Sequence, residues 1–221
     1  MMLVAVPIVP SACKTAGLTA WVCPMMTGNW RRLIKPNLPF IMAAKKMCNP
    51  FWNNALKRVI NQTNDARLRV ALVGLGHELC GDDAAGVMVA RGLQTMNHRH
   101  VHVVDAGCAP ENVGGELIRY APELILFVDA VHFDSHPGTV CLFDVDEIQR
   151  NSPTTHALSV HLLVEYLRAS IGCSIWLLGI QPAQMTLGAV LSPAVQNSVA
   201  DVVRTLSVTL GNPSICGENM L

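Results

Sequence analysis

VALVGLGHELCGDDAAG, residues Val70–Gly86, is the stretch that decides how this chain folds. Its apolar run Val70–Val73 predicts a buried strand, and the glycines that follow predict a turn. Asp82 and Asp83 come next and open a segment with the pattern of a helix, Ala84–Leu93. A strand, a glycine turn and a helix with acids at its start form a ligand-facing unit in open α/β sheets.

Outward from this stretch, predicted strands and helices alternate. The predicted strands are Arg69–Gly74, Val101–Asp105, Leu124–Asp129, Thr139–Phe143 and Ser174–Ile180. The predicted helices are Asp83–Met96, Asn112–Ala121, Thr155–Ile171 and Pro193–Leu210, the last with Ser192 as its cap. Apolar strands without alternation, set between helices, indicate a mostly parallel sheet that is covered on both faces. We therefore expect an α/β fold.

The charged residues divide the chain into two parts. Residues 1–64 hold eight of the sixteen Lys and Arg residues and no acid, whereas residues 65–221 hold all sixteen acids. This shift predicts a basic, poorly ordered N-terminal extension over 1–64 and one folded domain over 65–221. Within the extension, Phe51–Gln62 has the pattern of a short helix. A further hypothesis is that Met42 or Met47 is the true start of the protein.

Composition also bears on the redox environment of the protein, on its partners and on membrane insertion. The eight cysteines contain no CxxC pair, which argues against a disulfide framework and favours buried, reduced thiols in the cytoplasm. Zero formal net charge does not favour a polyanion such as nucleic acid as partner. The uncharged stretch Cys173–Ala200 is interrupted by prolines and amide side chains, so it makes a poor membrane span.

Three candidate ligands are expected at one edge of the predicted sheet. Asp83 follows the first strand, Asp129 ends an apolar strand, and His156 stands at the start of a long helix. Ligands bind outside the carboxyl ends of such strands, and two carboxylates with an imidazole suit a divalent first-row metal. Each residue also has a purely structural interpretation. Asp83 or its neighbour Asp82 would cap a helix, Asp129 would accept bonds from loop amides, and His156 would be solvated.

Several other kinds of site fit the sequence poorly. A dinucleotide fingerprint needs glycine where this chain has Leu79, and the adjacent acids would repel a pyrophosphate. The chain has no GK[ST] of a P-loop and no G-x-S-x-G elbow. The paired Asp-Thr/Ser-Gly segments of two-domain aspartic proteases are missing as well.

Six segments of the chain occur in a familiar order. They are GLGHELCGDDAAG, VDAGCAPEN (Val104–Asn112), LILFVDA (Leu124–Ala130), PGTV (Pro137–Val140), TTHALS (Thr154–Ser159) and LLGIQP (Leu177–Pro182). Together they resemble the NiFe-hydrogenase maturation endopeptidases, above all the type that serves hydrogenase 3 of formate hydrogenlyase. The resemblance covers about Arg69–Leu210. It implies a three-layer fold in which a twisted, mostly parallel five-stranded sheet lies between helices.

The resemblance also implies a function. Such enzymes remove a C-terminal extension from the hydrogenase large subunit after nickel has been inserted. The two acids and the histidine of the family's metal site fall on Asp83, Asp129 and His156, which would make the chain an aspartyl protease that recognises the nickel of its substrate. The expected partner is a nickel-loaded large-subunit precursor, met in the cytoplasm by a monomer. The chain departs from the family's pattern at His77 and Ala84, where asparagine and glycine are usual.

Two other functions and one mechanistic choice stay open at this point. The chain would otherwise be a small-molecule or nucleotide-binding α/β domain, or a maturation chaperone that holds the precursor without cutting it. Water would be activated either by a metal or by a carboxylate that acts as general base.

Overall fold

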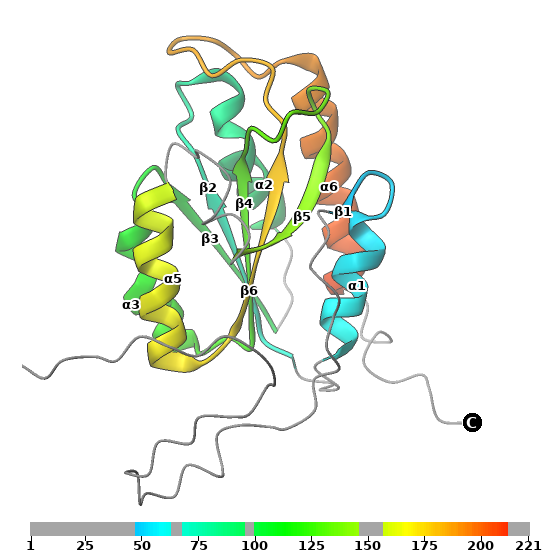
Figure 1. Cartoon of the computed structure of the whole chain (residues 1–221). Coiled ribbons are helices and arrows are strands. Elements are labelled where there is room, and N and C mark those ends of the chain that lie inside the picture. Colours follow the sequence, from blue (N-terminus) through cyan, green and yellow to red (C-terminus); the bar gives the residue numbers. More distant parts are fainter. Residues whose placement is uncertain (1–46, 63–67, 96–99, 146–156, 212–221) are drawn as a thin grey trace, which may run out of the picture. The chain divides into compact units, whose positions relative to one another are not determined.

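The computed structural model describes residues 47–62, 68–95, 100–145 and 157–211, which form a six-stranded sheet covered by helices (Figure 1). The order across the sheet is β1-β5-β6-β4-β2-β3. The strands are β1 (Met47–Cys48), β2 (Val70–Leu75), β3 (Val101–Gly107), β4 (Leu124–Ala130), β5 (Val140–Asp144) and β6 (Ser174–Ile180). The strands from β6 to β3 pair in parallel, and β5 and β1 are antiparallel to their neighbours. The predicted mostly parallel sheet is confirmed, and β1 adds a strand to the five expected.

Helices cover both faces of this sheet. The helices are α1 (Trp52–Gln62), α2 (Ala85–Leu93), α3 (Gly114–Tyr120), α5 (Ala157–Ile171) and α6 (Pro193–Gly211), with 3-10 turns η2 (Gly81–Ala84) and η3 (Pro110–Val113). One apolar core joins α1, α2 and α6 to one face of the sheet, and a second core joins α3 and α5 to the other. The three-layer prediction is confirmed. Of the helices described, none combines the length and the apolar character that a membrane span requires.

Strand β4 shows why the predicted strands lack alternation. All seven of its residues are buried. Leu124, Leu126 and Val128 belong to the core under α1, α2 and α6, whereas Ile125 and Phe127 belong to the core under α3 and α5. Successive side chains of a strand point to opposite faces, so a strand covered on both sides must be apolar throughout.

The N-terminal elements β1 and α1 belong to the folded unit. Both fall inside residues 1–64, which the charge division separates from the domain, so the structure carries the fold upstream of that boundary. The predicted short helix is confirmed as α1, and Trp52, Leu56 and Val59 on one of its faces lie in the same core as β5. A count of charged residues does not reveal the apolar face of α1, because the opposite face of such a helix is polar. Residues 1–46 lie outside the described residues.

A disulfide joins β1 to β5. Cys48 and Cys141 face each other in the antiparallel register of the two strands and are bonded through their sulfurs. The expectation of reduced thiols is wrong for this pair, because 93 residues separate the two cysteines and only the strand pairing brings them together. Cys80, Cys108 and Cys173 are free, as expected.

Candidate functional site

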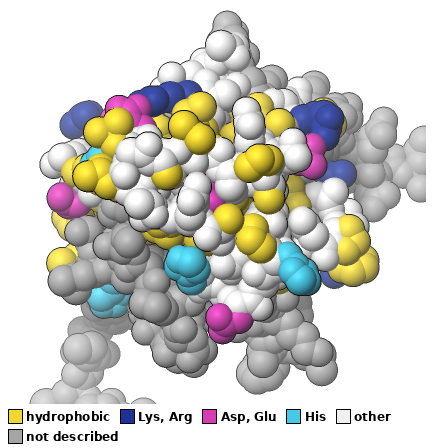
Figure 2. Space-filling model, turned by 90° about the horizontal axis from the view of Figure 1, so that it is seen from above, with side chains coloured by type: hydrophobic (Ala, Val, Ile, Leu, Met, Phe, Trp, Pro, Cys, Tyr) yellow, Lys and Arg dark blue, Asp and Glu magenta, His cyan; other side chains and the backbone are white. Residues whose placement is uncertain are grey.

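The parallel strands β2, β4 and β6 end at the same edge of the sheet, called the carboxyl edge below. Three segments meet there, namely the turn 76–84, the β4–β5 loop 131–139 and the β6–α6 loop 181–192 (Figure 1). Figure 2 looks onto this edge, where acidic and histidine side chains lie among hydrophobic ones. In open α/β sheets this is the edge at which ligands bind.

The glycine turn after β2 brings Asp83 to this edge. Gly76 has φ +128°, and a Cβ atom there would lie 1.7 Å from the backbone oxygen of Asp83, so only glycine fits. The turn then aims the His77 backbone N–H at the carboxylate Oδ2 of Asp83, at 2.8 Å. Asp83 is only 4% exposed. The turn therefore fixes a buried carboxylate by a backbone hydrogen bond.

Asp129, at the end of β4, is the second carboxylate. It is 1% exposed, and its Oδ1 accepts a hydrogen bond from the Ala130 backbone N–H at 2.8 Å. Burial, and after it the charge of Asp83, raise the pKa of Asp129 to about 8. The turn η2, which carries Asp83, also packs against β4, which carries Asp129. The structure thus brings together two of the three predicted ligands, Asp83 and Asp129.

This carboxylate pair is chemically suited to a divalent cation. A cation between Asp83 and Asp129 would offset their mutual repulsion and favour the ionised form of both, and oxygen ligands suit hard and borderline metals. His156, the third predicted ligand, lies outside the described residues. Among the residues that are described, no group of three His, Cys, Asp or Glu side chains is arranged to hold a metal. The ligand triad therefore remains a prediction.

Asp82 makes different contacts from its neighbour Asp83. It is fully buried, and its carboxylate accepts hydrogen bonds from the backbone N–H groups of Ala183, Gln184 and Ser192 and from the Ser192 hydroxyl. Burial alone would raise the pKa of Asp82, but these four hydrogen bonds together lower it. Asp82 thus ties the turn to the β6–α6 loop and to the start of α6, which the sequence did not reveal.

Gln181 connects the other two loops. Its buried side-chain oxygen accepts from the backbone N–H groups of Phe133, at 2.9 Å, and Ser135, at 3.3 Å. Its backbone oxygen accepts from the Gly138 N–H at 2.8 Å. The β4–β5 loop is therefore folded around one glutamine of the β6–α6 loop. His132 and His136 of this β4–β5 loop are exposed.

A charged cluster links the turn to β3. The Arg91 guanidinium, on α2, donates to Glu78 at 2.7 Å and to Asp105 at 2.9 Å. These two carboxylates raise the pKa of Arg91. The cluster spans α2, the turn and the end of β3, and it escaped sequence reasoning because its members lie 13 and 14 residues apart.

The structure also shows the contacts of His77, which stands where asparagine is usual in the pattern. The ring Nδ1 of His77 accepts a hydrogen bond from the Leu79 backbone N–H at 3.2 Å. The His77 backbone oxygen accepts from the Cys80 N–H at 3.0 Å. The residue therefore shapes the turn, and Nδ1 is not available as a metal ligand in this arrangement.

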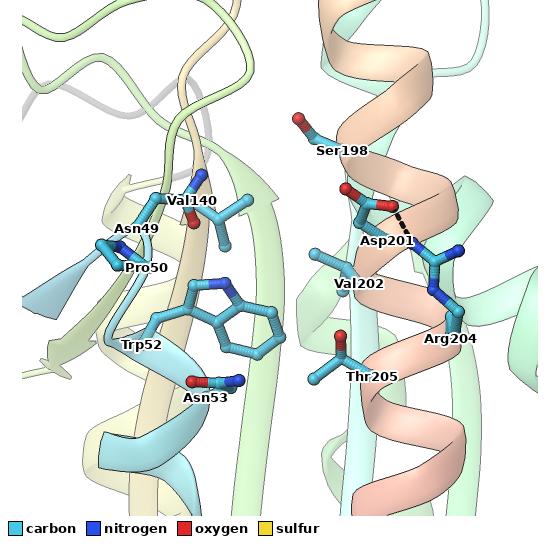
Figure 3. A pocket seen from close by; sticks show the side chains of 10 residues that line it. All are labelled: Asn49, Pro50, Trp52, Asn53, Val140, Ser198, Asp201, Val202, Arg204 and Thr205. Carbon is cyan, nitrogen blue, oxygen red and sulfur yellow. Dashed lines mark hydrogen bonds and ion pairs between the residues drawn. The ribbon is translucent and has the colours of Figure 1, made fainter.

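A separate pocket of about 350 Å³ lies between α1 and α6. Figure 3 shows the Trp52 indole on one side of it, facing the side chains of Asp201, Val202 and Thr205 on α6. Its lining, drawn from the described residues, does not include Asp83 or Asp129. The carboxylate pair is thus a distinct site.

Comparison with known proteins supports one family. Residues 87–208 match the family model HycI, described as hydrogenase maturation protease. A putative hydrogenase maturation protease of Methanocaldococcus jannaschii is 33% identical over 122 residues, which are 52% of this chain and 72% of that protein. The hydrogenase 3 maturation protease of Escherichia coli K12 is 30% identical over 142 residues, which are 64% of this chain and 90% of the relative.

Solved structures agree with these matches. The NiFe hydrogenase maturation protease HycI of Thermococcus kodakarensis is 27% identical, with a TM-score of 0.63, over 70% of this chain and 99% of that one. The endopeptidase HycI of Escherichia coli is 28% identical, with a TM-score of 0.59, over 66% of this chain and 94% of that one. Strand β1 and helix α1 precede the residues that the family model matches.

Proposed function

The chain belongs to the hydrogenase maturation protease family, and we propose that Asp83, Asp129 and His156 form the site at which it cuts a hydrogenase precursor. The chain is a hydrolase of the endopeptidase type. The bond cut is proposed to be the one before the C-terminal extension of the large subunit. The alternative of a nucleotide-binding domain is not favoured, because the relatives are named as proteases.

One observation carries the proposal for the site. Two carboxylates, 46 residues apart in sequence, are buried together at the edge of the sheet where ligands bind. Burying two carboxyl groups near each other is costly, and groups with such perturbed pKa values cluster at functional sites. A structural role alone would be met more cheaply by amides or apolar side chains.

The path of helix α5 supports the assignment of His156. Only Gly172 and Cys173 separate the end of α5 from β6, so α5 runs back along the sheet and begins toward the carboxyl edge (Figure 1). Its first residue is Ala157, which directly follows His156 in the sequence. The start of α5 toward the edge that carries Asp83 and Asp129 supports the proposed role of His156.

In this proposal the nickel belongs to the substrate, and the three side chains recognise it in the precursor. A divalent cation held here would polarise a carbonyl group or lower the pKa of a water molecule. The backbone N–H groups of His77 and Ala130 hold the two carboxylates in place. With its pKa near 8, Asp129 retains a proton at neutral pH while no cation is bound, and it becomes a proton acceptor once that proton leaves.

The test mixes nickel-loaded precursor with the wild-type protein and with Asp83→Asn, Asp129→Asn or His156→Ala, and measures product mass. We expect the wild type to release the extension and each variant to lose at least a hundredfold in rate. Asp134→Asn is the matched control, because Asp134 is an exposed acid of the neighbouring loop and should leave the rate unchanged. Full activity of both Asp83→Asn and His156→Ala would reject the site.

Three finer statements complete the proposal. The substrate is a large-subunit precursor that already carries nickel, the reaction takes place in the cytoplasm, and the enzyme acts as a monomer. Light scattering on the purified protein measures its mass directly and would reject the monomer if it returned twice the chain mass of 23.9 kDa.

A further inference from the structure

Large apolar side chains are exposed beside the carboxylate pair. Leu79 in the glycine turn is 59% exposed, and Leu187 and Val190 in the β6–α6 loop are 72% and 80% exposed. We call these three residues the apolar patch. Figure 2 shows hydrophobic side chains at the surface of this edge. Leaving such side chains in water costs free energy that covering them would recover.

Backbone hydrogen bonds join the two halves of the patch. The Gly188 N–H donates to the Leu79 oxygen at 2.7 Å, which places Leu187 beside Leu79. The Asp82 N–H donates to the Gln184 oxygen at 3.0 Å, and the Asp82 carboxylate binds both ends of the loop. The patch is therefore a preformed surface, and covering it requires little ordering of the loop.

Part of the patch belongs to the turn that carries the proposed active site, because Leu79 stands four residues before Asp83. Asp82, which secures the loop, directly precedes Asp83 in the chain. The loop itself, residues 183–192, reads AQMTLGAVLS and has no charged residue. A charged segment of a partner would find no counter-ion along this loop, whereas an apolar, uncharged segment would lose only water.

We propose that the apolar patch docks an apolar, uncharged segment of the protein substrate near the carboxylate pair. This inference rests on the proposed function, because its occupant is the precursor that the site cuts. Docking on a preformed apolar surface lowers the concentration of substrate needed for half-maximal rate and leaves the chemical step unchanged.

The test compares Leu187→Ser, Val190→Ser and their double variant with two matched controls. Leu162→Ser on α5 and Val208→Ser near the end of α6 alter side chains that are also well exposed, at 61% and 64%, but lie outside the turn and the loop. Processing of nickel-loaded precursor is followed over a range of precursor concentrations. We expect KM to rise about tenfold or more in the double variant with kcat within about twofold of wild type. The controls should keep the wild-type KM.

The outcomes separate this inference from the proposed function. If the wild type processes precursor, Asp83→Asn does not, and the double variant keeps the wild-type KM, the docking surface is rejected and the site stands. A fall in kcat at constant KM would reject it equally. A wild type that leaves nickel-loaded precursor uncut would instead overturn the proposed function. If light scattering shows a wild-type dimer that the double variant loses without a change in KM, a second copy covers the patch and the inference fails. Unchanged thermal unfolding of the variants verifies their fold.

Discussion

Asp129 and Asp83 are both buried where η2 packs against β4, and burial together with the Asp83 charge raises the Asp129 pKa to about 8. The two carboxylates come from different elements, since Asp83 is in η2 and Asp129 is the residue before the last of β4. The pair therefore stores an electrostatic cost in the metal-free protein. A cation bound between them would remove that cost, so binding and stability should be coupled.

The first prediction concerns the pH dependence of stability. The pKa of Asp129 is higher in the folded protein than its ordinary value of 3.8, so folding takes up a proton between these two values. The contribution of Asp129 to stability is then full at low pH and declines as the pH rises toward about 8. Asp129→Asn removes this decline, and thermal unfolding of the metal-free variant should occur several degrees higher than wild type at pH 8 but at the same temperature at pH 4.

Asp134→Asn serves as control for this prediction, because Asp134 is exposed and should not alter the slope. Equal melting temperatures of wild type and Asp129→Asn at pH 8 would contradict the raised pKa. Adding a divalent cation should reduce the loss of wild-type stability with rising pH. It should have no such effect on Asp129→Asn.

The second prediction concerns Asp82, which binds the β6–α6 loop. Asp82→Asn places an amide donor among four donors and should lower the free energy of unfolding by about 2–4 kcal/mol. Ser192→Ala removes the hydroxyl's bond to Asp82 and the long bond that it accepts from the Val195 N–H, and should cost about 1 kcal/mol. Urea unfolding measures both.

The Asp82 contribution also has a predicted sign with pH. Its folded pKa lies below the ordinary value of 3.8, so its stabilising effect is present above that pH and is lost as the pH falls through the folded pKa. The difference between wild type and Asp82→Asn should therefore shrink in strong acid. A difference that stays constant down to the lowest pH would argue against an ionised Asp82.

The third prediction tests the glycine turn. Gly76→Ala places a Cβ atom against the Asp83 backbone oxygen at a backbone conformation that alanine resists, so we expect a loss of about 3 kcal/mol or more together with loss of processing. Gly107→Ala is matched, because Gly107 also has a positive φ but an added Cβ meets open space. It should cost about 1 kcal/mol. Similar costs for the two variants would contradict the close approach of the turn to Asp83.

The fourth prediction tests whether α1 is part of the folded unit. Leu56 is buried in the core shared with the sheet, and Leu56→Ala should lower the free energy of unfolding by about 2–5 kcal/mol. Lys57→Ala changes an exposed neighbour on the same helix and should stay within about 0.5 kcal/mol. A negligible effect of Leu56→Ala would mean that α1 is dispensable for the fold.

Much of this architecture could be predicted from local pattern. A few consecutive residues are enough to predict the buried strand β4 and the glycine turn before η2. The meeting of Asp83 and Asp129 also followed from pattern, because parallel strands end at one edge of a sheet. The central strands, the helices and this pair are thus consequences of short-range sequence and general topology.

Other features depend on contacts that no local pattern encodes. The sequence offers Asp83 as a ligand and Asp82 only as a possible helix cap, and the role of Asp82 as a loop anchor depends on a loop 110 residues later. The pairing of β1 with β5 likewise joins segments 93 residues apart and depends on the placement of α1. Residues 51–62 have the pattern of a helix, but the division of charge places them outside the predicted domain.

The position of β1 affects whether the sheets of two molecules can pair edge to edge. An uncovered outer strand offers free N–H and C=O groups to which a strand of another molecule can add. Along β5 the chain supplies its own partner at Leu142 and Cys141, and the Asn49 N–H caps the Val140 oxygen at 3.0 Å. Intermolecular sheet growth is thereby obstructed on that flank, and within the described part of the chain β3 is left as the strand at the opposite margin.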